Sequence, residues 1–371
     1  MRANRLQIIG AVAGCALALA AIQPTHAQST AVLGLEKGTP DLKSAGPLAF
    51  GPYGVLLVGD PQSATVFAID TRDKSGDPNS VSVAIDDLGA KLSELFDGAK
   101  VEVNDLAVNP LSGNVYLSVT AGDKPALCRV GADGKVSQLS LAGVPFSSAT
   151  LPNAPANEAV GEGRRRRNPR DESITDLAFL DGQVIVTGLA AGDGPSNART
   201  LAFPFVEADS GASLQIYHGA HGREEDAAPA RTFVALNIGG EPSLLAGFTC
   251  TPLVRFPLGD IAAGEKVHGT TVAELGNHNR PLDMIVYQKG GKDYLLMANS
   301  ARGVMKVSTD DIERAEGIDE HVRDGSTAGQ KYETITELDG VVQLDRLGDA
   351  HAVIVSQSDD GALSLRTIEL P

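Results

Sequence analysis

Two histidines and a cysteine are the residues of this chain best suited by type to hold a metal ion. The segment Tyr217-His218-Gly219-Ala220-His221 places two imidazoles three residues apart in a glycine-rich stretch, and His278 and Cys250 are expected on the same face of the fold. Imidazole nitrogen and thiolate sulfur suit zinc or copper, and three protein ligands leave one coordination position open. The pattern predicts a zinc or copper site. The alternative is a solvated polar loop whose histidines bond to neighbouring backbone groups.

Two arginines farther along the chain predict an anion-binding site. Arg280 stands in the segment GNHNRPLDM and Arg302 in ANSARG, and Asn277 and Asn299 accompany them. A guanidinium group is a planar fork of donors that matches carboxylate or phosphate. We expect these four residues to bind a small anionic ligand. The alternative is that each arginine pairs with a nearby acid such as Asp283.

A strand pattern that recurs about six times must position these residues. The phrase GVLLVGDPQSATVFAID (residues 54–70) returns in outline as DYLLMANSARGVMKVST (residues 293–309). Each copy has a short apolar strand, a polar turn and a second strand. A single sheet unit of this kind buries its faces only against copies of itself. The pattern therefore predicts an all-β fold, a six-bladed β-propeller.

The alternation of apolar and polar residues gives the boundaries of the expected blades. The six units cover residues 47–85, 102–141, 174–217, 232–274, 282–336 and 341–368. The last unit has only three strands, and residues 30–35 form a spare strand near the N-terminus. We expect this N-terminal strand to complete the last blade, because closing the ring removes exposed sheet edges.

The predicted fold collects polar residues on one face. In a propeller, the connections between blades and the turns between the second and third strands surround the same mouth of the central channel, and loops on a rigid scaffold commonly carry function. We therefore expect a binding or accessory module that uses its channel-mouth face for a small ligand, a metal or a protein partner. Asp105, Asp176 and Asp283 recur at the start of three blades, which predicts that they accept backbone N–H bonds there.

The phrase VNDLAVNPLSGNVYLSV (residues 103–119) resembles the six-bladed propellers of the NHL-repeat and gluconolactonase-like superfamily. This resemblance implies a divalent cation at the channel mouth, held by carboxylate and amide oxygens that suit calcium. Asn104 matches one ligand position of that family, whereas Leu282 stands at another and cannot ligate. A lactonase-like, metal-dependent hydrolase is one alternative function. A redox accessory protein using the histidines and Cys250 is the other.

The N-terminus predicts export. Arg2 and Arg5 precede an apolar run over residues 6–22, and a small-residue cleavage site ends at Ala27, so residues 1–27 fit a cleaved signal peptide. A lipoprotein anchored through Cys15 is the alternative. Residues 28–371 are expected to form one propeller domain, periplasmic or secreted and monomeric, with no further membrane span.

Composition excludes several partners and chemistries. The net charge of −16 becomes −18 when cleavage removes two arginines and no acids, so nucleic acid is not an expected partner. The two remaining cysteines, Cys128 and Cys250, fall in separate blades and are expected to be unpaired. The sequence has no Cys-x-x-Cys-His, Gly-x-Ser-x-Gly or His-Glu-x-x-His motif, so covalent haem, serine-hydrolase and zincin functions lose their usual support.

Overall fold

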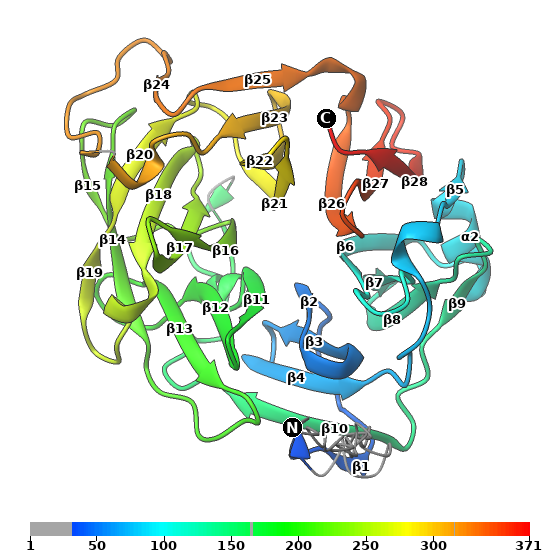
Figure 1. Cartoon of the computed structure of the whole chain (residues 1–371). Coiled ribbons are helices and arrows are strands. Elements are labelled where there is room, and N and C mark those ends of the chain that lie inside the picture. Colours follow the sequence, from blue (N-terminus) through cyan, green and yellow to red (C-terminus); the bar gives the residue numbers. More distant parts are fainter. Residues whose placement is uncertain (1–31, 164–165, 315) are drawn as a thin grey trace, which may run out of the picture.

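The computed structural model describes residues 32–163, 166–314 and 316–371, and the expected signal peptide lies outside them. The regular secondary structure of the described chain is almost entirely β-strand, in six sheets arranged around a central axis (Figure 1). The prediction of a six-bladed β-propeller is confirmed. No helix in the described ranges is both long enough and apolar enough to cross a membrane.

The first three blades, numbered in chain order of their inner strands, carry the N-terminal half of the fold. Blade one contains β2 (Leu48–Phe50), β3 (Val55–Asp60), β4 (Thr65–Asp70), β10 (Val144–Thr150) and β1 (Glu36–Gly38). Blade two contains β6 (Val101–Val108), β7 (Val115–Ala121), β8 (Lys124–Val130) and β9 (Val136–Gln138). Blade three contains β11 (Asp176–Leu180), β12 (Gln183–Leu189), β13 (Ser196–Ala202), β14 (Ala212–His218), β15 (Arg223–Glu225) and β19 (Lys266–His268).

The other three blades follow in order. Blade four contains β16 (Thr232–Ile238), β17 (Glu241–Gly247), β18 (Pro252–Pro257), β20 (Thr270–Glu274) and β24 (Ala328–Gly329). Blade five contains β21 (Pro281–Lys289), β22 (Lys292–Asn299), β23 (Gly303–Ser308) and β25 (Tyr332–Ile335). Blade six contains β26 (Val341–Leu347), β27 (His351–Gln357), β28 (Leu363–Glu369) and β5 (Ala84–Ile85).

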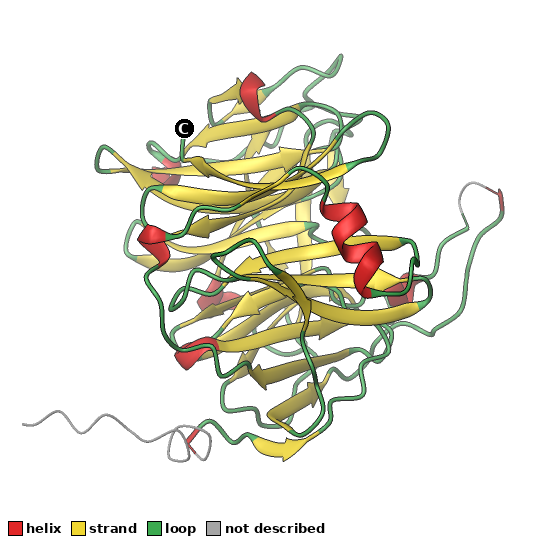
Figure 2. Cartoon of the chain, turned by 90° about the vertical axis from the view of Figure 1, so that its right-hand side faces the viewer, coloured by secondary structure: helices red, strands yellow, loops and turns green. Residues whose placement is uncertain are grey.

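Helices are few and short. One α-helix is described, α2 (Leu88–Leu95), with Asp87 as its N-cap. Short 3-10 turns occur at η1 (Pro52–Gly54), η2 (Pro78–Ser80), η4 (Pro169–Glu172), η5 (Leu258–Asp260), η6 (Ile312–Arg314) and η7 (Thr336–Leu338). Figure 2 shows α2 lying across the edges of the strands on the outside of the ring. Its buried Leu88 and Leu92 pack into the core between blades two and six.

The blades do not follow one another around the ring in chain order. Neighbouring inner strands contact in the circular order β2, β6, β26, β21, β16, β11 and back to β2 (Figure 1). Six apolar clusters among the described residues occupy the six gaps between these neighbours. Blade two therefore lies between blades one and six, and blade three packs against blade one.

The expected closure of the ring by an N-terminal strand is wrong. Residues 32–35 form no strand, and β1 pairs with β10 on the outside of blade one. The fourth strand of blade six is β5, in which Ile85 pairs with Leu365. The sequence pattern assigns residues 81–85 to blade one, because they follow its third strand directly. Their alternating Val81, Val83 and Ile85 instead enter the core between blades six and two.

A second strand, β10, returns to a blade that the chain formed earlier. β10 follows the last strand of blade two but pairs with β4, which makes it the fourth strand of blade one. The sequence pattern does not predict a strand at residues 144–150. The next inner strand, β11, then packs against β2. Two strands, β5 and β10, thus complete blades whose other strands lie elsewhere in the sequence.

We predict that closure through β5 contributes strongly to stability. The change Ile85→Ala should lower the free energy of unfolding by roughly 2–5 kcal/mol, because a buried aliphatic side chain is lost between two blades. Ile85 is 3% exposed, whereas Val32, the control for Val32→Ala, is 70% exposed. Denaturant unfolding of both variants measures the difference, and equal effects would contradict the assignment of β5 to the closure.

Candidate functional site at the channel mouth

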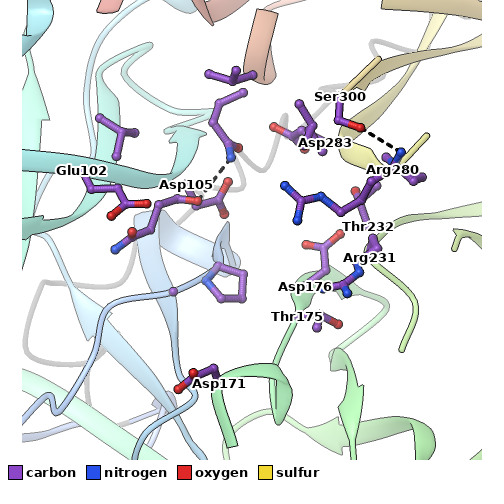
Figure 3. Close-up of a pocket in the computed structure, with 18 of the residues that line it drawn as sticks. Glu102, Asp105, Asp171, Thr175, Asp176, Arg231, Thr232, Arg280, Asp283 and Ser300 are labelled. Carbon is purple, nitrogen blue, oxygen red and sulfur yellow. Dashed lines mark hydrogen bonds between the residues drawn. The ribbon is translucent and has the colours of Figure 1, made fainter. Parts of the chain in front are cut away.

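A cavity of about 780 Å³ opens at one end of the central channel and is lined by residues from all six blades (Figure 3). A second cavity of about 590 Å³ occupies the other end. Asp105, Asp176 and Asp283 line both cavities. These three side chains therefore form the waist of the channel, at the floor of the larger cavity.

The waist aspartates hold neighbouring blades together. The N–H group of Leu48 in blade one donates to Asp105 Oδ2 of blade two at 2.6 Å. In the same way, Phe233 of blade four donates to Asp176 of blade three at 2.7 Å. The structure thus confirms that these recurring aspartates accept backbone N–H groups.

The pattern extends around blades five, six and two. Leu344 N–H donates to Asp283 Oδ2, and Val108 N–H donates to Asp345 Oδ2, both at 2.7 Å. The second oxygen of Asp176, Asp283 and Asp345 accepts the N–H of the following residue, again at 2.7 Å. Each carboxylate therefore ties its own strand to the strand beside it.

Burial favours the neutral form of these acids. Burial and the nearby charge of Asp176 raise the pKa of Asp105 well above its ordinary value, and burial and the charge of Asp105 do the same for the pKa of Asp283. Burial raises the pKa of Asp176 to about 7 and that of Asp345 to about 6, although backbone N–H groups partly oppose it. The floor of the cavity therefore carries less negative charge near neutral pH than its composition suggests.

Two arginines reach the cavity, and their surroundings differ. Arg231 Nη2 lies 2.7 Å from Glu172 Oε1, and Arg231 Nε donates to Thr249 Oγ1 at 3.2 Å. Arg280 is exposed, and no described acid lies within ion-pair distance of its guanidinium group. Its backbone is fixed, because Arg280 N–H donates to Ser300 Oγ at 3.0 Å and Ser300 N–H donates to Arg280 O at 2.9 Å. A rigid rim therefore presents one guanidinium group to the cavity (Figure 3).

The other residues predicted for the anion site lie behind this rim. Arg302 Nη2 donates to the backbone oxygen of Asn277 at 3.2 Å, and its guanidinium packs against Gly276. Asn299 is 6% exposed and accepts from Asn279 Nδ2 at 3.0 Å. None of the three lines the cavity, whereas Arg280 does. Ligand binding by Arg302, Asn277 and Asn299 stays a prediction.

Asn104 lines the cavity, and two hydrogen bonds from its amide nitrogen fix the orientation of its side chain. Asn104 Nδ2 donates to Ala45 O at 2.7 Å and to Thr120 Oγ1 at 2.9 Å. The described residues place no group of three His, Cys, Asp or Glu side chains around it with the spacing of a metal site. Its role as a calcium ligand stays a prediction that rests on the family resemblance.

Sequence reasoning did not single out two polar groups on the cavity wall. Gln343 Oε1 is a buried atom without a hydrogen-bond partner among the described residues, and Thr232 carries a buried hydroxyl that interacts with the Asp176 carboxyl group. Gln343 uses its Nε2 to donate to Asn104 O at 3.2 Å, which leaves its oxygen free to accept. The sequence carried little signal for Thr232 and Gln343, because a single polar residue on an inner strand does not by itself indicate a binding role.

The structure brings together three of the four predicted His and Cys ligands. His218, His221 and Cys250 each offer a ligand atom within 4.8 Å of those of the other two. His278 does not join this group. The group adjoins the cavity without lining it: Cys250 N–H donates to Asn279 O at 2.7 Å, one residue before Arg280.

Comparison with known proteins gives similarity at the level of structure only. No protein-family model and no curated protein sequence matches the chain. A PQQ-bound aldose sugar dehydrogenase from Streptomyces coelicolor is 12% identical, with 90% of this chain and 96% of that chain covered and a TM-score of 0.32. A candidate glucose dehydrogenase from Thermus thermophilus is 14% identical (90% and 99%, TM-score 0.35). A chain of the mitotic checkpoint complex is 9% identical (96% and 99%, TM-score 0.39). At these scores the similarities carry no inference about function.

We predict a pH-dependent effect of Asp176→Asn. At pH 4 the variant should be less stable by about 1–3 kcal/mol, because an amide nitrogen then faces a backbone N–H. The folded pKa of about 7 lies above the unfolded value, so ionisation of Asp176 costs the wild type stability as pH rises from 4 to 7. The variant does not titrate there, so the difference should shrink.

Denaturant unfolding between pH 4 and 8 measures this difference in stability. The matched control is Asp123→Asn, an exposed aspartate between β7 and β8. A constant difference between wild type and Asp176→Asn over this range would show that the waist carboxyl group does not titrate as proposed.

Proposed function

We propose that this protein is a binding module that takes a small organic anion into the channel-mouth cavity. The observation that carries the proposal is the Arg280 guanidinium, which faces a cavity of about 780 Å³ without an acidic partner among the described residues. The neighbouring Arg231 is paired with Glu172, so its guanidinium group already has an acidic partner. A carboxylate fits the planar donor fork that Arg280 presents.

The rest of the cavity supports a ligand of this class. Its volume falls in the ordinary range for small-molecule sites. Gln343 Oε1 is a buried acceptor without a partner among the described residues, so a ligand that also carries a hydroxyl or ammonium donor would satisfy it. Because burial raises the pKa of the waist aspartates, the floor repels an anion less than three ionised carboxylates would.

Ligand binding has more support than the hydrolase alternative. The family resemblance implies a cation at Asn104, which would have to be held by its amide oxygen, because the amide nitrogen donates to Ala45 and Thr120. The described channel mouth offers no set of three ionisable metal ligands. The proposal also includes export, which rests on the signal-peptide pattern of residues 1–27 and on nothing in the described structure.

We predict that Arg280→Ala weakens ligand binding roughly 10- to 100-fold, the amount expected for loss of a charged hydrogen-bonding partner. Isothermal titration calorimetry of the mature chain with malate, gluconate, glutamate and inorganic phosphate gives the affinities. Arg280→Lys should retain part of the affinity, because it keeps the charge but not the planar fork.

The control variant is Arg366→Ala, which removes the same charge from an exposed position on β28, away from the cavity. It should bind like the wild type. Unchanged binding in Arg280→Ala, or equal losses in both variants, would contradict a direct role for Arg280.

A further inference from the structure

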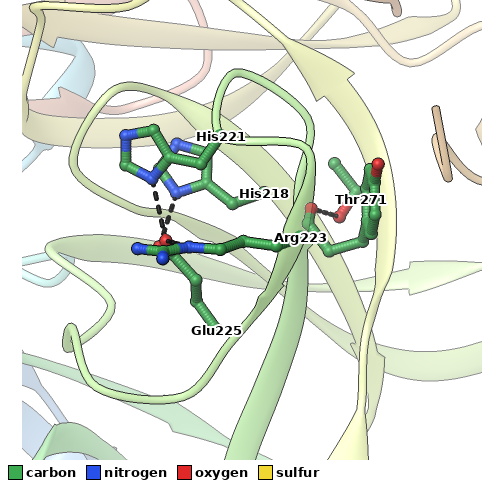
Figure 4. Close-up of polar contacts among 6 residues, drawn as sticks. His218, His221, Arg223, Glu225 and Thr271 are labelled. Carbon is green, nitrogen blue, oxygen red and sulfur yellow. Dashed lines mark hydrogen bonds and ion pairs between the residues drawn. The ribbon is translucent and has the colours of Figure 1, made fainter. Parts of the chain in front are cut away.

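The two histidines are brought together by one tight turn beside the channel mouth. His218 ends β14, and the N–H groups of His221 and Gly222 both donate to His218 O, at 3.0 and 2.8 Å. This turn stacks the two imidazole rings with their centroids 3.8 Å apart and their planes inclined by 35° (Figure 4). His218 is 3% exposed, whereas the side chain of His221 is 43% exposed. One imidazole is therefore buried and the other is open to solvent.

Cys250 reaches the same place from another blade. It lies in the turn between β17 and β18 and has a left-handed backbone, with φ of 66° at Cys250 and 57° at Thr251. Non-glycine residues in this conformation are strained and persist only where the surrounding structure holds them. Here Cys250 N–H donates to Asn279 O at 2.7 Å, and Thr251 Oγ1 donates to Gly276 O at 2.6 Å. The strained turn brings the Cys250 thiol up to the histidines.

A single carboxylate fixes both imidazoles. Glu225 Oε2 lies 2.8 Å from His218 Nδ1, and Glu225 Oε1 lies 2.8 Å from His221 Nδ1 (Figure 4). Arg223 Nε also donates to Glu225 Oε1, at 2.9 Å. Burial alone would raise the pKa of Glu225, but the hydrogen bonds from the two histidines and Arg223 outweigh it and lower the pKa to about 2. Glu225 is therefore an ionised acceptor, and each Nδ1 is its donor.

This arrangement decides which ring nitrogen is free. A neutral histidine that donates from Nδ1 has its lone pair on Nε2. His218 Nε2 is buried and has no hydrogen-bond partner among the described residues. A carboxylate that orients a histidine through its outer nitrogen is the usual second partner of a metal-bound imidazole.

We propose that His218, His221 and Cys250 form a transition-metal site for zinc or copper, with Glu225 as the residue that orients both imidazoles. Two imidazole nitrogens and a thiolate suit these ions rather than calcium or magnesium. The three ligand atoms lie within 4.8 Å of one another, and a tetrahedral site with ordinary bond lengths needs about 3.5 Å between them. The side chains must rotate to close this difference when an ion binds. Three protein ligands leave the fourth position for an exogenous ligand.

Opposite charges lie close together at this site. A divalent ion and one thiolate leave one positive charge, and the ionised Glu225 lies beside it, although Glu225 also pairs with the exposed Arg223. A second acid, Glu274, is 1% exposed and packs against Gly219. Burial raises the pKa of Glu274 to about 7, although the amides of Gly219 and Ala220 oppose it, so this acid adds less charge than an exposed one.

The long connection before β25 covers the turn and provides a control residue. Val322 N–H donates to Gly219 O at 2.9 Å, and the His321 ring packs against Gly222. His321 therefore touches the same turn, but it is not among the three grouped ligands. A variant at His321 removes a nearby imidazole without removing a proposed ligand.

The test is metal binding by the full mature chain, purified without a histidine tag and stripped with chelator. After the ion is added back and the excess is removed, we expect one Zn²⁺ or Cu²⁺ per chain by elemental analysis. The unfolding temperature should rise when the ion is added. Glu225→Gln should weaken binding roughly 10- to 100-fold, and His218→Ala and Cys250→Ser should weaken it more. The matched control His321→Ala should bind like the wild type.

Spectroscopy and thiol chemistry distinguish coordination from a structural effect. Co²⁺ or Cu²⁺ should give a thiolate charge-transfer band that disappears in Cys250→Ser, and bound Zn²⁺ should protect Cys250 from alkylation. Cys128 is a silent reference, because it is fully buried and burial raises its pKa to about 12. Absence of binding by the wild type at micromolar metal would overturn the proposal. Binding that survives Cys250→Ser, or that is lost in His321→Ala, would overturn the ligand assignment.

Discussion

A four-stranded sheet with two apolar faces is buried only when it lies between two neighbours, and the whole protein depends on this constraint. Every residue of β3 and β4 is buried, and an apolar cluster fills each gap between adjacent blades of the described ring. The ring must therefore close, or two blades would expose their faces. Two strands close the ring by pairing with a blade other than that of their neighbours in the sequence: β5 completes blade six and β10 completes blade one.

The same constraint shapes the channel. Packing six inner strands around one axis brings backbone N–H groups of one blade next to the strand beside it. Aspartates at the waist accept these groups, and each one spans two strands. Their burial disfavours the ionised form and raises the pKa, so residues that hold the ring together also set the charge of the cavity floor. The waist aspartates therefore couple the stability of the ring to the charge of the cavity floor.

Both candidate sites stand where connections from different blades meet. Arg280 is presented by the rim of blade five. The other arginine of the cavity, Arg231, is paired with Glu172. The histidine turn follows the outer strand of blade three, whereas Cys250 comes from a turn of blade four. Neither site exists within one repeat. Each is a product of how two or more blades are set against one another.

The sequence by itself determined the repeating unit, because alternating burial leaves a period-two pattern in each strand. It thereby identified the six blades and the accepting role of the recurring aspartates, and it named four His and Cys residues, three of which the structure groups. Tertiary structure alone decided the partners of β5 and β10, since neither strand pairs with the strand that its position in the sequence suggests: β5 pairs with β28 and β10 with β4. It also separated Arg280 from Arg302 and excluded His278 from the His and Cys group, because these outcomes depend on distances between loops that are far apart in the chain.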